Sequence, residues 1–506
     1  MARGGICEMP NAKFVLALDQ GTTSSRALVF DETARVRSVS QLPTTQDFPR
    51  PGWVNQDASE IWSTTLAVAR DALERASVDG RDVAAIGIVN QRETLVVWDR
   101  ETSAPAAPVI VWQSRQSQPQ IDALLGRGMG ATYQYTTGLV PDAYFTASKL
   151  AWLLEADPEL RRRADAGDVL AGTVDSWLLW NLTHGEVHAT DVSNASRTML
   201  FDIRSLDWSP ELVRDLDLPP QMLPRVVPSA GVAGRTAPGL LGAEIPISGI
   251  AGDQQAALFG QTCFEPGDAK NTYGTGAFLL MNTGKEPQAS THKLLSTIAW
   301  QVDESVAYAL EGSVFICGAS VEWLRDGLGI IDQVRDVEVL AGSVPDSGGV
   351  TVVPALTGLG APHWDTAARG TILGLTRGST AAHIARATLE AIAFQTRDVT
   401  TAMSADSGIP LTSLRVDGGA ARNDLLLQIQ ADVLGVPVIR PENVETTAVG
   451  AAFLAGLGQG LWPDQSSLAG RWVVDRVFEP AVSAEMREDC YATWKRAVER
   501  SLDWAR

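Results

Sequence analysis

The stretch Phe14-Val-Leu-Ala-Leu-Asp-Gln-Gly-Thr-Thr-Ser-Ser-Arg-Ala-Leu-Val-Phe30 near the start of the chain decides the fold class. Two apolar, strand-like runs flank a turn rich in Gly, Thr and Ser, which predicts a β-hairpin. Glycine lets the backbone approach a phosphate closely, and the hydroxyls and amides can donate to its oxygens. The turn is therefore a candidate phosphate cradle, although turns of this composition also simply connect strands.

A similar arrangement recurs in the second half of the chain. The apolar run Ile245–Ala251 ends in Gly252-Asp253, and the turn Asn271-Thr-Tyr-Gly-Thr-Gly276 precedes a second apolar run, Ala277–Met281. Each half thus offers a strand, a hydroxyl-rich turn and a returning strand. Two such turns, one from each half, could hold one polyphosphate.

Helix signals accompany the strands in both halves. Asp57–Glu60 has the spacing of a capping box, and Asn423 or Asp424 can cap a helix that Gly435 would end. Mixed strands and helices in two similar halves predict an α/β protein of two domains, with a boundary near residues 250–265 and a cleft that could hold a small molecule. The stretch Ser229–Ala243, rich in Gly, Ala and Pro, is expected to be a surface loop.

Composition excludes several classes of function. The 506 residues carry a formal net charge of −19, which disfavours nucleic acid as a partner. No apolar run is long enough to span a membrane, and no apolar run follows the arginine near the N-terminus, so neither an integral membrane segment nor a signal peptide is expected. The four cysteines lack paired or zinc-type spacing, which favours a reducing compartment, the cytoplasm.

Several polar side chains at predicted strand ends could carry chemistry. Asp19 and Asp253 each follow an apolar run, and together they make a plausible Mg²⁺ ligand and general base, although either could merely form a turn or cap a helix. Arg92-Glu93 follows another strand and offers donors and an acceptor suited to neighbouring hydroxyls; a surface ion pair is the alternative. Gly284-Lys285 lacks the glycine spacing of a P-loop, so a kinase would need a different phosphate cradle.

Taken in order, these segments resemble the FGGY carbohydrate kinase family, and within it the members that act on glycerol. The resemblance runs from about Lys13 to the C-terminus, and long matches carry it: Leu18–Arg26, Pro51–Val54, Asn90–Thr94, Asn194–Phe201, Ile245–Gln255, Lys270–Gly276 and Arg415–Gly419.

The resemblance implies two similar lobes of the actin/hexokinase-type (ribonuclease H-like) ATPase fold with an interlobe cleft. Residues 1–12 would be a disordered extension, 13–257 the N-terminal lobe and 258–506 the C-terminal lobe. It implies a cytoplasmic enzyme that phosphorylates glycerol with ATP and Mg²⁺, and a homo-oligomer, either a dimer or a tetramer.

The resemblance also assigns roles to individual residues. ATP would be contacted by Thr22, Thr23, Ser24, Arg26, Thr275, Gly318, Glu322, Gly419 and Asn423. Glycerol would be held by Arg92, Glu93, Tyr144, Asp253 and Gln254, with Trp112 and Phe278 along its carbons. Asp253 would take the proton from the attacking hydroxyl, and Asp19 and Asp253 would stand at the Mg²⁺ site.

The sequence departs from the family pattern at several positions. Glu322 stands where glutamine is common, and His363 where tyrosine is usual. The loop Gly239–Ala243 lacks the Gly-Gly-Lys pattern that binds fructose 1,6-bisphosphate in regulated members, and Gly231–Arg235 lacks a histidine that some members phosphorylate. Inherited regulation is therefore in doubt. The alternatives are a kinase of another polyol or sugar, and a nucleotide-switch protein without a polyol pocket.

Overall fold

The computed structural model describes residues 13–505, so the expected disordered extension lies outside the described residues. The chain divides into two compact units. Unit 1 holds residues 13–262, Thr297–Tyr308 and Thr447–Arg471, and unit 2 holds Cys263–Ser296, Ala309–Thr446 and residues 472–505. Two later segments thus return to unit 1, whereas the expected lobes were contiguous; the lobe boundary at residues 257 and 258 stays a prediction.

Unit 1 contains seven neighbouring strands of a mixed sheet. Their order is β17-β13-β14-β5-β1-β2-β3. Strands β1, β2 and β3 are antiparallel, whereas β5 runs parallel to β1, and β14 runs parallel to β5. The strands span Phe14–Gln20 (β1), Ser24–Phe30 (β2), Val36–Pro43 (β3), Val83–Asn90 (β5), Ala230–Arg235 (β13), Pro246–Gly252 (β14) and Leu295–Val302 (β17).

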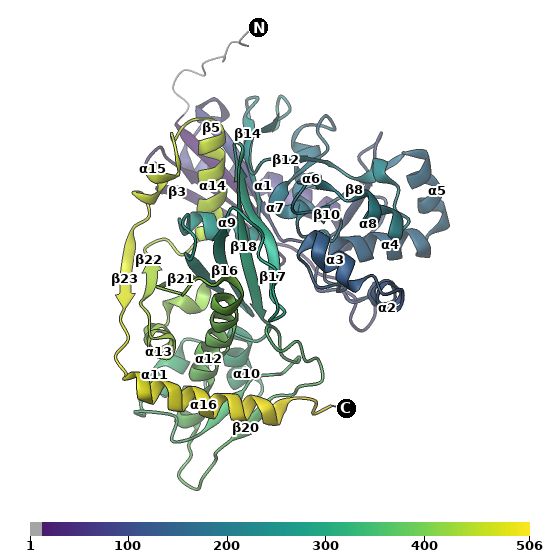
Figure 1. Cartoon of the computed structure of the whole chain (residues 1–506). Helices are drawn as coiled ribbons and strands as arrows, with labels where there is room; N and C mark the ends of the chain where they lie inside the picture. The colour runs from purple at the N-terminus through teal and green to yellow at the C-terminus, as the bar shows by residue number, and fades with distance from the viewer. Residues whose placement is uncertain (1–12, 506) are drawn as a thin grey trace. The chain divides into compact units, whose positions relative to one another are not determined.

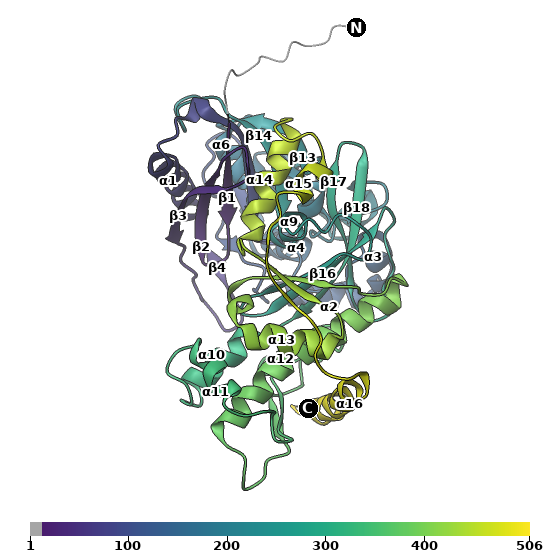
Figure 2. The ribbon, with the colours of Figure 1, turned by 90° about the vertical axis from the view of Figure 1, so that its left-hand side faces the viewer.

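Unit 1 also contains helices and short strands, of which some contact this sheet. Figure 2 shows α1 alongside β2 and β3, with which it is in contact. The helices are α1 (Ala58–Ala76), α2 (Gln118–Gly126), α3 (Gly130–Thr137), α4 (Thr146–Ala156), α5 (Pro158–Ala166), α6 (Val174–Leu182), α7 (Val192–Ala195), α8 (Pro210–Asp215), α9 (Asp253–Gly260), α14 (Thr446–Gly458) and α15 (Gln465–Ala469). The short elements are β4 (Asn55–Gln56), η1 (Gly80–Asp82), β6 (Val96–Asp99), β7 (Val109–Ile110), β8 (Val169–Gly172), β9 (Ala189–Asp191), β10 (Phe201–Asp202), β11 (Asp207–Trp208), η2 (Pro220–Met222) and β12 (Arg225–Val227).

Unit 2 contains the strand order β23-β22-β21-β15-β16-β18. Figure 1 shows α16 near the C-terminus, and this helix packs against α12. The strands are β15 (Ala269–Tyr273), β16 (Ala277–Gly284), β18 (Ser305–Val314), β19 (Thr351–Val353), β20 (Thr371–Leu373), β21 (Leu414–Asp417), β22 (Val438–Pro441) and β23 (Val474–Phe478). The helices are α10 (Gly318–Asp326), α11 (Asp336–Gly342), α12 (Ala381–Ser407), η3 (Gly419–Arg422), α13 (Asp424–Leu434) and α16 (Ala484–Ser501).

The two units repeat one plan, as the sequence predicted, although β14, which was expected to open the second half, belongs to unit 1. In unit 1 the antiparallel hairpin β1–β2 has the parallel strand β5 beside β1; in unit 2 the antiparallel hairpin β15–β16 has the parallel strand β21 beside β15. Each unit buries its own apolar core, for example Leu16, Ile86 and Trp177 in unit 1 and Met281, Leu389 and Trp494 in unit 2.

Local signals explain the helix ends. Asn423 caps α13 by accepting a hydrogen bond from the Leu426 amide at 2.8 Å, and Gly435 ends the helix at φ 74°. Asp57 caps α1 through the Ser59 amide at 2.8 Å. The carboxylate of Glu60, however, accepts from the amide and hydroxyl of Thr45, and these bonds differ from those of the predicted capping box.

One expected loop is partly a strand. Within Ser229–Ala243, residues Ala230–Arg235 form β13, which pairs with β14 and, at Ala230, with β17. Small residues with low strand propensity are held here because neighbouring strands supply the hydrogen-bond partners.

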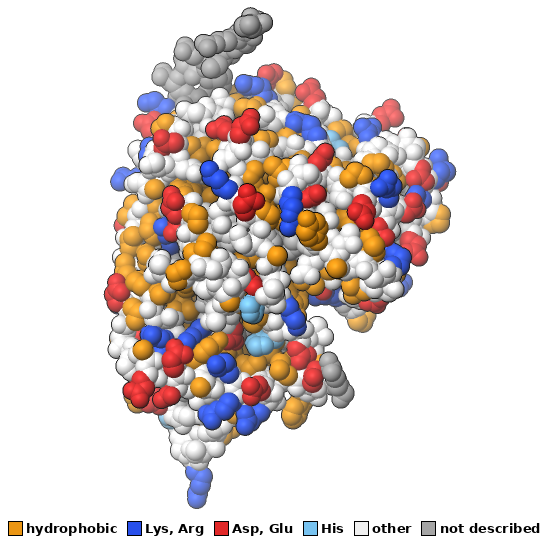
Figure 3. All heavy atoms as spheres, viewed as in Figure 1, with side chains coloured by type: hydrophobic (Ala, Val, Ile, Leu, Met, Phe, Trp, Pro, Cys, Tyr) orange, Lys and Arg blue, Asp and Glu red, His pale blue; other side chains and the backbone are white. Residues whose placement is uncertain are grey.

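The surface carries many charged side chains of both signs. On the face shown in Figure 3, acidic and basic side chains are interspersed. Within residues 13–505, no helix combines the length and the apolar character needed to cross a membrane.

Candidate functional site

The carboxyl ends of three neighbouring parallel strands bring the predicted unit 1 residues to one edge of the sheet. Gln20 of β1 pairs with Asn90 of β5, which also pairs with Gly252 of β14. Asp19 lies one residue before this row, Arg92 two residues after it and Asp253 directly after it. Sequence positions more than 200 residues apart therefore converge at this edge, hereafter the strand-end site.

Arg92 and Asp253 form the centre of the strand-end site. Arg92 Nε lies 3.0 Å from Asp253 Oδ1, and the side chain of Arg92 is 2% exposed whereas that of Asp253 is 33% exposed. Arg92 also donates from Nη1 to Gln255 Oε1 at 3.1 Å. A Cβ at Gly252 would stand 2.7 Å from the Arg92 side chain, so glycine is needed there for the arginine to cross. The pair fixes an accessible carboxylate on a buried cation.

Glu93 is buried beside this pair. Its backbone adopts φ 59°, which residues other than glycine seldom adopt, and its carboxylate accepts from Arg197 Nε at 2.7 Å. Arg92 Nε is 3.9 Å from the same carboxylate. Arg92 and Glu93 are therefore not a surface ion pair. Strain of this kind tends to occur at functional sites.

Aromatic side chains connect the strand-end site to the turn after β1. The rings of Trp112 and Tyr144 meet edge to face with centroids 5.6 Å apart, and Trp112 Nε1 donates to Thr22 Oγ1 at 2.9 Å. Thr22 still has its own hydroxyl proton to donate. One of the predicted phosphate-turn residues is thus fixed by one of the residues expected to line glycerol.

A buried lysine that the sequence reading did not single out supports the same loop. Lys149 Nζ donates to the Tyr144 carbonyl. Burial lowers the pKa of Lys149 to about 7, while the nearby carboxylates of Glu93 and Asp142 act in the opposite direction. Burial therefore disfavours the charged form of this amine.

The turn itself is a short hairpin tied to its surroundings. The Gly21 amide donates to the Ser24 carbonyl at 2.9 Å, and the Thr44 amide donates to the Thr23 carbonyl at 3.0 Å. Ser24 Oγ accepts from Gln41 at 2.9 Å. Arg26 donates to Asp19 Oδ2 from Nη2 at 2.5 Å and from Nε at 3.1 Å. Asp19 is thus held by the arginine predicted to contact phosphate.

In unit 2 a second group of predicted residues gathers around the β15–β16 turn. The Gly318 amide donates to the Gly274 carbonyl at 3.0 Å, and the Cys317 and Ala319 amides donate to the Thr275 carbonyl at 2.9 and 3.1 Å. The turn therefore lies against the start of α10. Beside it, Gly418 adopts φ 85°, and a Cβ there would stand 2.4 Å from the Tyr273 carbonyl oxygen.

The remaining unit 2 candidates are near these elements. Gly419 follows Gly418 in η3, and Asn423 caps α13. Glu322 is exposed on α10, four residues after Gly318 and so on the same helix face. Phe278 pairs with Thr272 across the β15–β16 hairpin. The structure thus brings Thr275 and Gly318 together, with Gly419 after the neighbouring strand.

His363 follows the cis peptide Ala361–Pro362. Its Nε2 is 3.6 Å from Asp398 Oδ2, and Asp398 accepts from Tyr491 and Trp494 of α16 at 2.6 and 2.8 Å. This departure from the family pattern thus borders a buried cluster that joins α12 to α16.

The strand-end site offers oxygen ligands for a cation. Within residues 13–505, no three His, Cys, Asp or Glu side chains gather in a way that could hold a metal ion. Asp19 and Asp253 stand on β1 and after β14, two strand spacings or about 10 Å apart. Mg²⁺ keeps several waters and takes one or two carboxylates along with substrate phosphates. Asp19 and Asp253 are the carboxylates of this edge that could serve a Mg²⁺ ion arriving with a nucleotide, with water between ion and protein.

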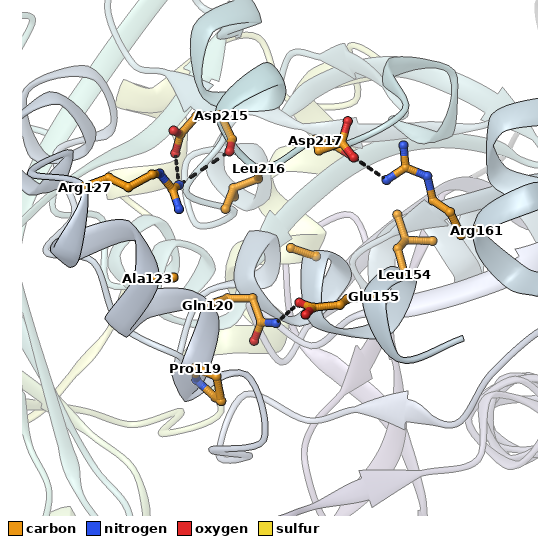
Figure 4. A pocket seen from close by; sticks show the side chains of 11 residues that line it. Pro119, Gln120, Ala123, Arg127, Leu154, Glu155, Arg161, Asp215, Leu216 and Asp217 are labelled. Carbon is orange, nitrogen blue, oxygen red and sulfur yellow. Dashed lines mark hydrogen bonds and ion pairs between the residues drawn. The ribbon is translucent and has the colours of Figure 1, made fainter. Parts of the chain in front are cut away.

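A separate hollow of about 450 Å³ lies among α2, α4, α5 and the end of α8. Figure 4 shows that its polar side chains are already paired: Arg127 with Asp215, Arg161 with Asp217, and Gln120 with Glu155. None of the predicted site residues lines it.

Sequence reading missed Arg197, Gln255 and Lys149, all of which contact predicted site residues. Arg197 and Gln255 lie within two of the stretches that carry the family resemblance, and that signal could have identified them. Lys149 lies outside those stretches, and only its position shows what it contacts.

Comparison with known proteins places the chain in a family. Residues 14–260 match the N-terminal domain, and residues 269–458 the C-terminal domain, of the FGGY family of carbohydrate kinases. The chain is 58% identical to a glycerol kinase of Aromatoleum aromaticum over 97% of this chain and 99% of the relative. It is 57% identical to a glycerol kinase of Symbiobacterium thermophilum over 98% and 99%.

A solved structure agrees in fold. The crystal structure of Plasmodium falciparum glycerol kinase with ADP matches with a TM-score of 0.91 and 34% identity, over 97% of this chain and 98% of the other. Fold, site residues and relatives point the same way: the chain belongs to the FGGY family of carbohydrate kinases, with the two-domain kinase fold of that family.

Proposed function

We propose that this protein phosphorylates glycerol with ATP to give sn-glycerol 3-phosphate, the first step of glycerol breakdown. Its similarity to glycerol kinases over nearly the full chain supports the substrate. The observation that carries the proposal is the strand-end site, where the buried Arg92 holds the accessible carboxylate of Asp253 at 3.0 Å. Glu93 lies next to them, and its carboxylate can accept hydrogen bonds from substrate hydroxyls.

In the proposed mechanism the polyol hydroxyls bind to Arg92, Glu93, Tyr144 and Gln254, and Trp112 and Phe278 cover the carbons. Asp253 accepts the proton of the terminal hydroxyl of the polyol. At the same time the hydroxyl oxygen bonds to the γ-phosphorus, and the bond between that phosphorus and the leaving ADP oxygen breaks. Phosphoryl transfer depends mainly on positioning and charge neutralisation, so the rigid arginine network should matter as much as the base.

The nucleotide would be held by Thr22, Thr23, Ser24, Arg26, Thr275, Gly318, Gly419 and Asn423, with Glu322 beside it on α10. The hydroxyl of Thr22 is oriented by Trp112, and the turn at Thr275 is fixed by the start of α10. Bound with the nucleotide, Mg²⁺ would neutralise phosphate charge. Asp19, already paired with Arg26, would hold that ion through water.

A coupled assay tests the substrate. The purified protein with ATP and Mg²⁺ should release ADP far faster with glycerol than with xylulose, ribulose or gluconate at equal concentration. The product should be oxidised by an NAD-linked sn-glycerol 3-phosphate dehydrogenase, which identifies the phosphorylated position. A faster reaction with a pentose or with gluconate would instead favour another sugar kinase of the family. ATP hydrolysis that ignores every polyol would favour a nucleotide switch.

The proposal extends to the compartment and the assembly of the protein. Cys317 is a buried free thiol, as suits the cytoplasm. A dimer or tetramer of identical chains stays a prediction, and light scattering after size-exclusion chromatography measures it directly.

A further inference from the structure

The segment from Asp191 to Arg197 underlies the strand-end site without belonging to the predicted binding residues. It comprises the end of β9, the short helix α7 and the turn that follows. Helix α7 packs against β14, the strand that leads to Asp253 (Figure 1). Asp191, Ser193, Asn194, Ser196 and Arg197 are all fully buried.

Asp191 anchors this segment through both carboxylate oxygens. Oδ1 accepts from Ser193 Oγ, the Asn194 amide and Asn194 Nδ2, each at 2.9 Å. Oδ2 accepts from the Ser193 amide at 2.9 Å and from Ser229 Oγ at 2.7 Å. Burial raises the pKa of Asp191, while these donors favour the charged form. Five hydrogen-bond donors thus compensate a carboxylate that is costly to bury.

Ser193 connects Asp191 to the backbone in front of Asp253. Its hydroxyl donates its single proton to Asp191, so its lone pairs are free to accept, and the Gly252 amide donates to it at 2.9 Å. Gly252 directly precedes Asp253. The direction of the Ser193 hydroxyl thus depends on Asp191, and the backbone in front of Asp253 depends on Ser193.

Asn194 connects Asp191 to the end of the strand before Arg92. Its side chain and that of Asn90 exchange two hydrogen bonds, at 3.0 and 3.1 Å. Asn194 Nδ2 also donates to Asp191, which fixes the orientation of this amide. Asn90 ends β5, two residues before Arg92.

The end of the segment reaches Glu93 and Gln255. Arg197 donates to Glu93 at 2.7 Å. Ser196 Oγ bonds to Thr297 Oγ1 at 2.9 Å, and Thr297 accepts from Gln255 at 3.3 Å. Gln255 in turn accepts from Arg92. One short segment therefore contacts the surroundings of Arg92, Glu93 and Asp253 together.

We propose that Asp191 is a positioning residue for the transfer step, which sets the places of Asp253 and Arg92 through Ser193 and Asn194. The proposal rests on the proposed function. A carboxylate is required because every partner of both oxygens is a donor; an amide would turn its own NH₂ toward a donor in either orientation. A displacement of about 1 Å at reacting groups can lower rates about a hundredfold.

The test compares Asp191→Asn and Ser193→Ala with the wild type. Ser193→Ala, which frees the Gly252 amide next to Asp253, should lower kcat about tenfold or more while the KM for glycerol changes little. Asp191→Asn, which disturbs both connections, should lower kcat and also raise the KM for glycerol. The split between the two constants is what general loosening of the fold would not produce.

Asp175 provides a matched control. It is equally buried and accepts from the hydroxyls of Thr173 and Thr190 at 2.5 and 2.7 Å. The charge of Asp191 acts on Asp175, but these hydrogen bonds reach neither Ser193 nor Asn194. Asp175→Asn should change thermal stability on a scale similar to Asp191→Asn and leave kcat and KM within about twofold, since its hydroxyl hydrogen bonds end on Thr173 and Thr190.

Retention of wild-type kcat by both Asp191→Asn and Ser193→Ala would overturn the proposal, and so would an equal loss of kcat in Asp175→Asn. If Asp191→Asn fails to fold, Ser193→Ala decides. If the wild type prefers another polyol, the proposed substrate is wrong, but the same kcat comparison on that polyol still decides the role of Asp191.

Discussion

At the scale of single residues, the strand-end site depends on charges whose partners are buried. Arg92 is shared between Asp253 and Gln255, while Glu93 is held by Arg197. Each acceptor therefore has a fixed donor, so a ligand hydroxyl meets groups that are already oriented. Preorganisation of this kind reduces the entropy that binding must overcome.

The charge of Glu322 should weaken nucleotide binding. Glu322 is exposed on the α10 face that begins at Gly318, so its carboxylate would repel the phosphates of a nucleotide held there. We expect Glu322→Gln to lower the apparent KM for ATP about twofold, the size of an exposed charge effect in water, and to leave that for glycerol unchanged. Steady-state kinetics at low salt measures this, and the difference should shrink as salt is added. Equal constants at low salt would mean that the side chain points away from the nucleotide.

Asp19 should govern the demand for magnesium. The carboxylate is buried against Arg26, and neutralising it removes half of the acidic pair at the strand-end site. Asp19→Asn is expected to raise the Mg²⁺ concentration needed for half-maximal activity, because a water-mediated ligand is weakened. Titration of activity with Mg²⁺ at fixed ATP tests this. An unchanged midpoint would remove Asp19 from the metal site.

Residue roles were predictable where a motif continued through a turn, and less so where partners came from distant segments. Asp19 and Thr22 lie in one hairpin, so their proximity could be read from the sequence. Arg197 and Glu93 lie 104 residues apart, and only the fold shows their 2.7 Å contact. The strained backbone of Glu93 likewise follows from packing and not from residue type.

At the scale of elements, helix ends were the most predictable feature. The cap at Asn423 and the stop at Gly435 are local, so α13 has the predicted ends. Strand β13 was missed because Gly and Ala give no strand pattern, and the neighbouring strands supply its order. Glu60 bonds to Thr45 because β3 and the loop after it approach the start of α1.

The junction of β8 and β9 should limit stability in acid. His188, just before β9, packs edge to face against the rings of Trp98 and Trp180, and its Nε2 donates to the Ala171 carbonyl at 3.0 Å. Burial lowers the pKa of His188 to about 4. The unfolded chain therefore binds a proton more readily between about pH 6.5 and 4. The contribution of the neutral, buried His188 to the stability of the fold is present above pH 6.5 and is lost as the pH falls toward 4.

His188→Gln keeps a donor near the Ala171 carbonyl and cannot titrate. We expect the melting temperature of this variant to fall less between pH 6.5 and 4 than that of the wild type, as followed by circular dichroism. Parallel curves for the two proteins would show that His188 does not contribute to the acid limb.

At the scale of the whole molecule, the shared plan of the two units explains why a similar strand-turn-strand pattern could be recognised in both halves of the sequence. Each unit repeats a hairpin beside a parallel strand, so the two hydroxyl-rich turns occupy equivalent places in their own sheets. The return of Thr297–Tyr308 and Thr447–Arg471 to unit 1 was not predictable, because contacts between distant segments decide it.

Regulation is a property of the whole molecule, and this chain lacks both regulatory patterns that the family resemblance led us to look for. The loop Gly239–Ala243 lacks the Gly-Gly-Lys pattern, and Gly231–Arg235 lacks a histidine. We expect fructose 1,6-bisphosphate at millimolar concentration to leave activity nearly unchanged, because no lysine of that pattern is present to hold its phosphates. The coupled assay with and without the bisphosphate checks this. Strong inhibition would mean that another loop builds the site.

The central claim is that Asp253 receives the proton of glycerol during transfer to the γ-phosphate. Asp253→Asn keeps the size of the side chain but removes the charge that accepts the proton. The variant should lose about 10²- to 10⁴-fold in kcat, the usual contribution of a general base. Its affinity for glycerol, measured by calorimetry, should weaken only modestly, since Arg92 remains held by Gln255. A variant that keeps most of its kcat would contradict the assignment of Asp253 as the base.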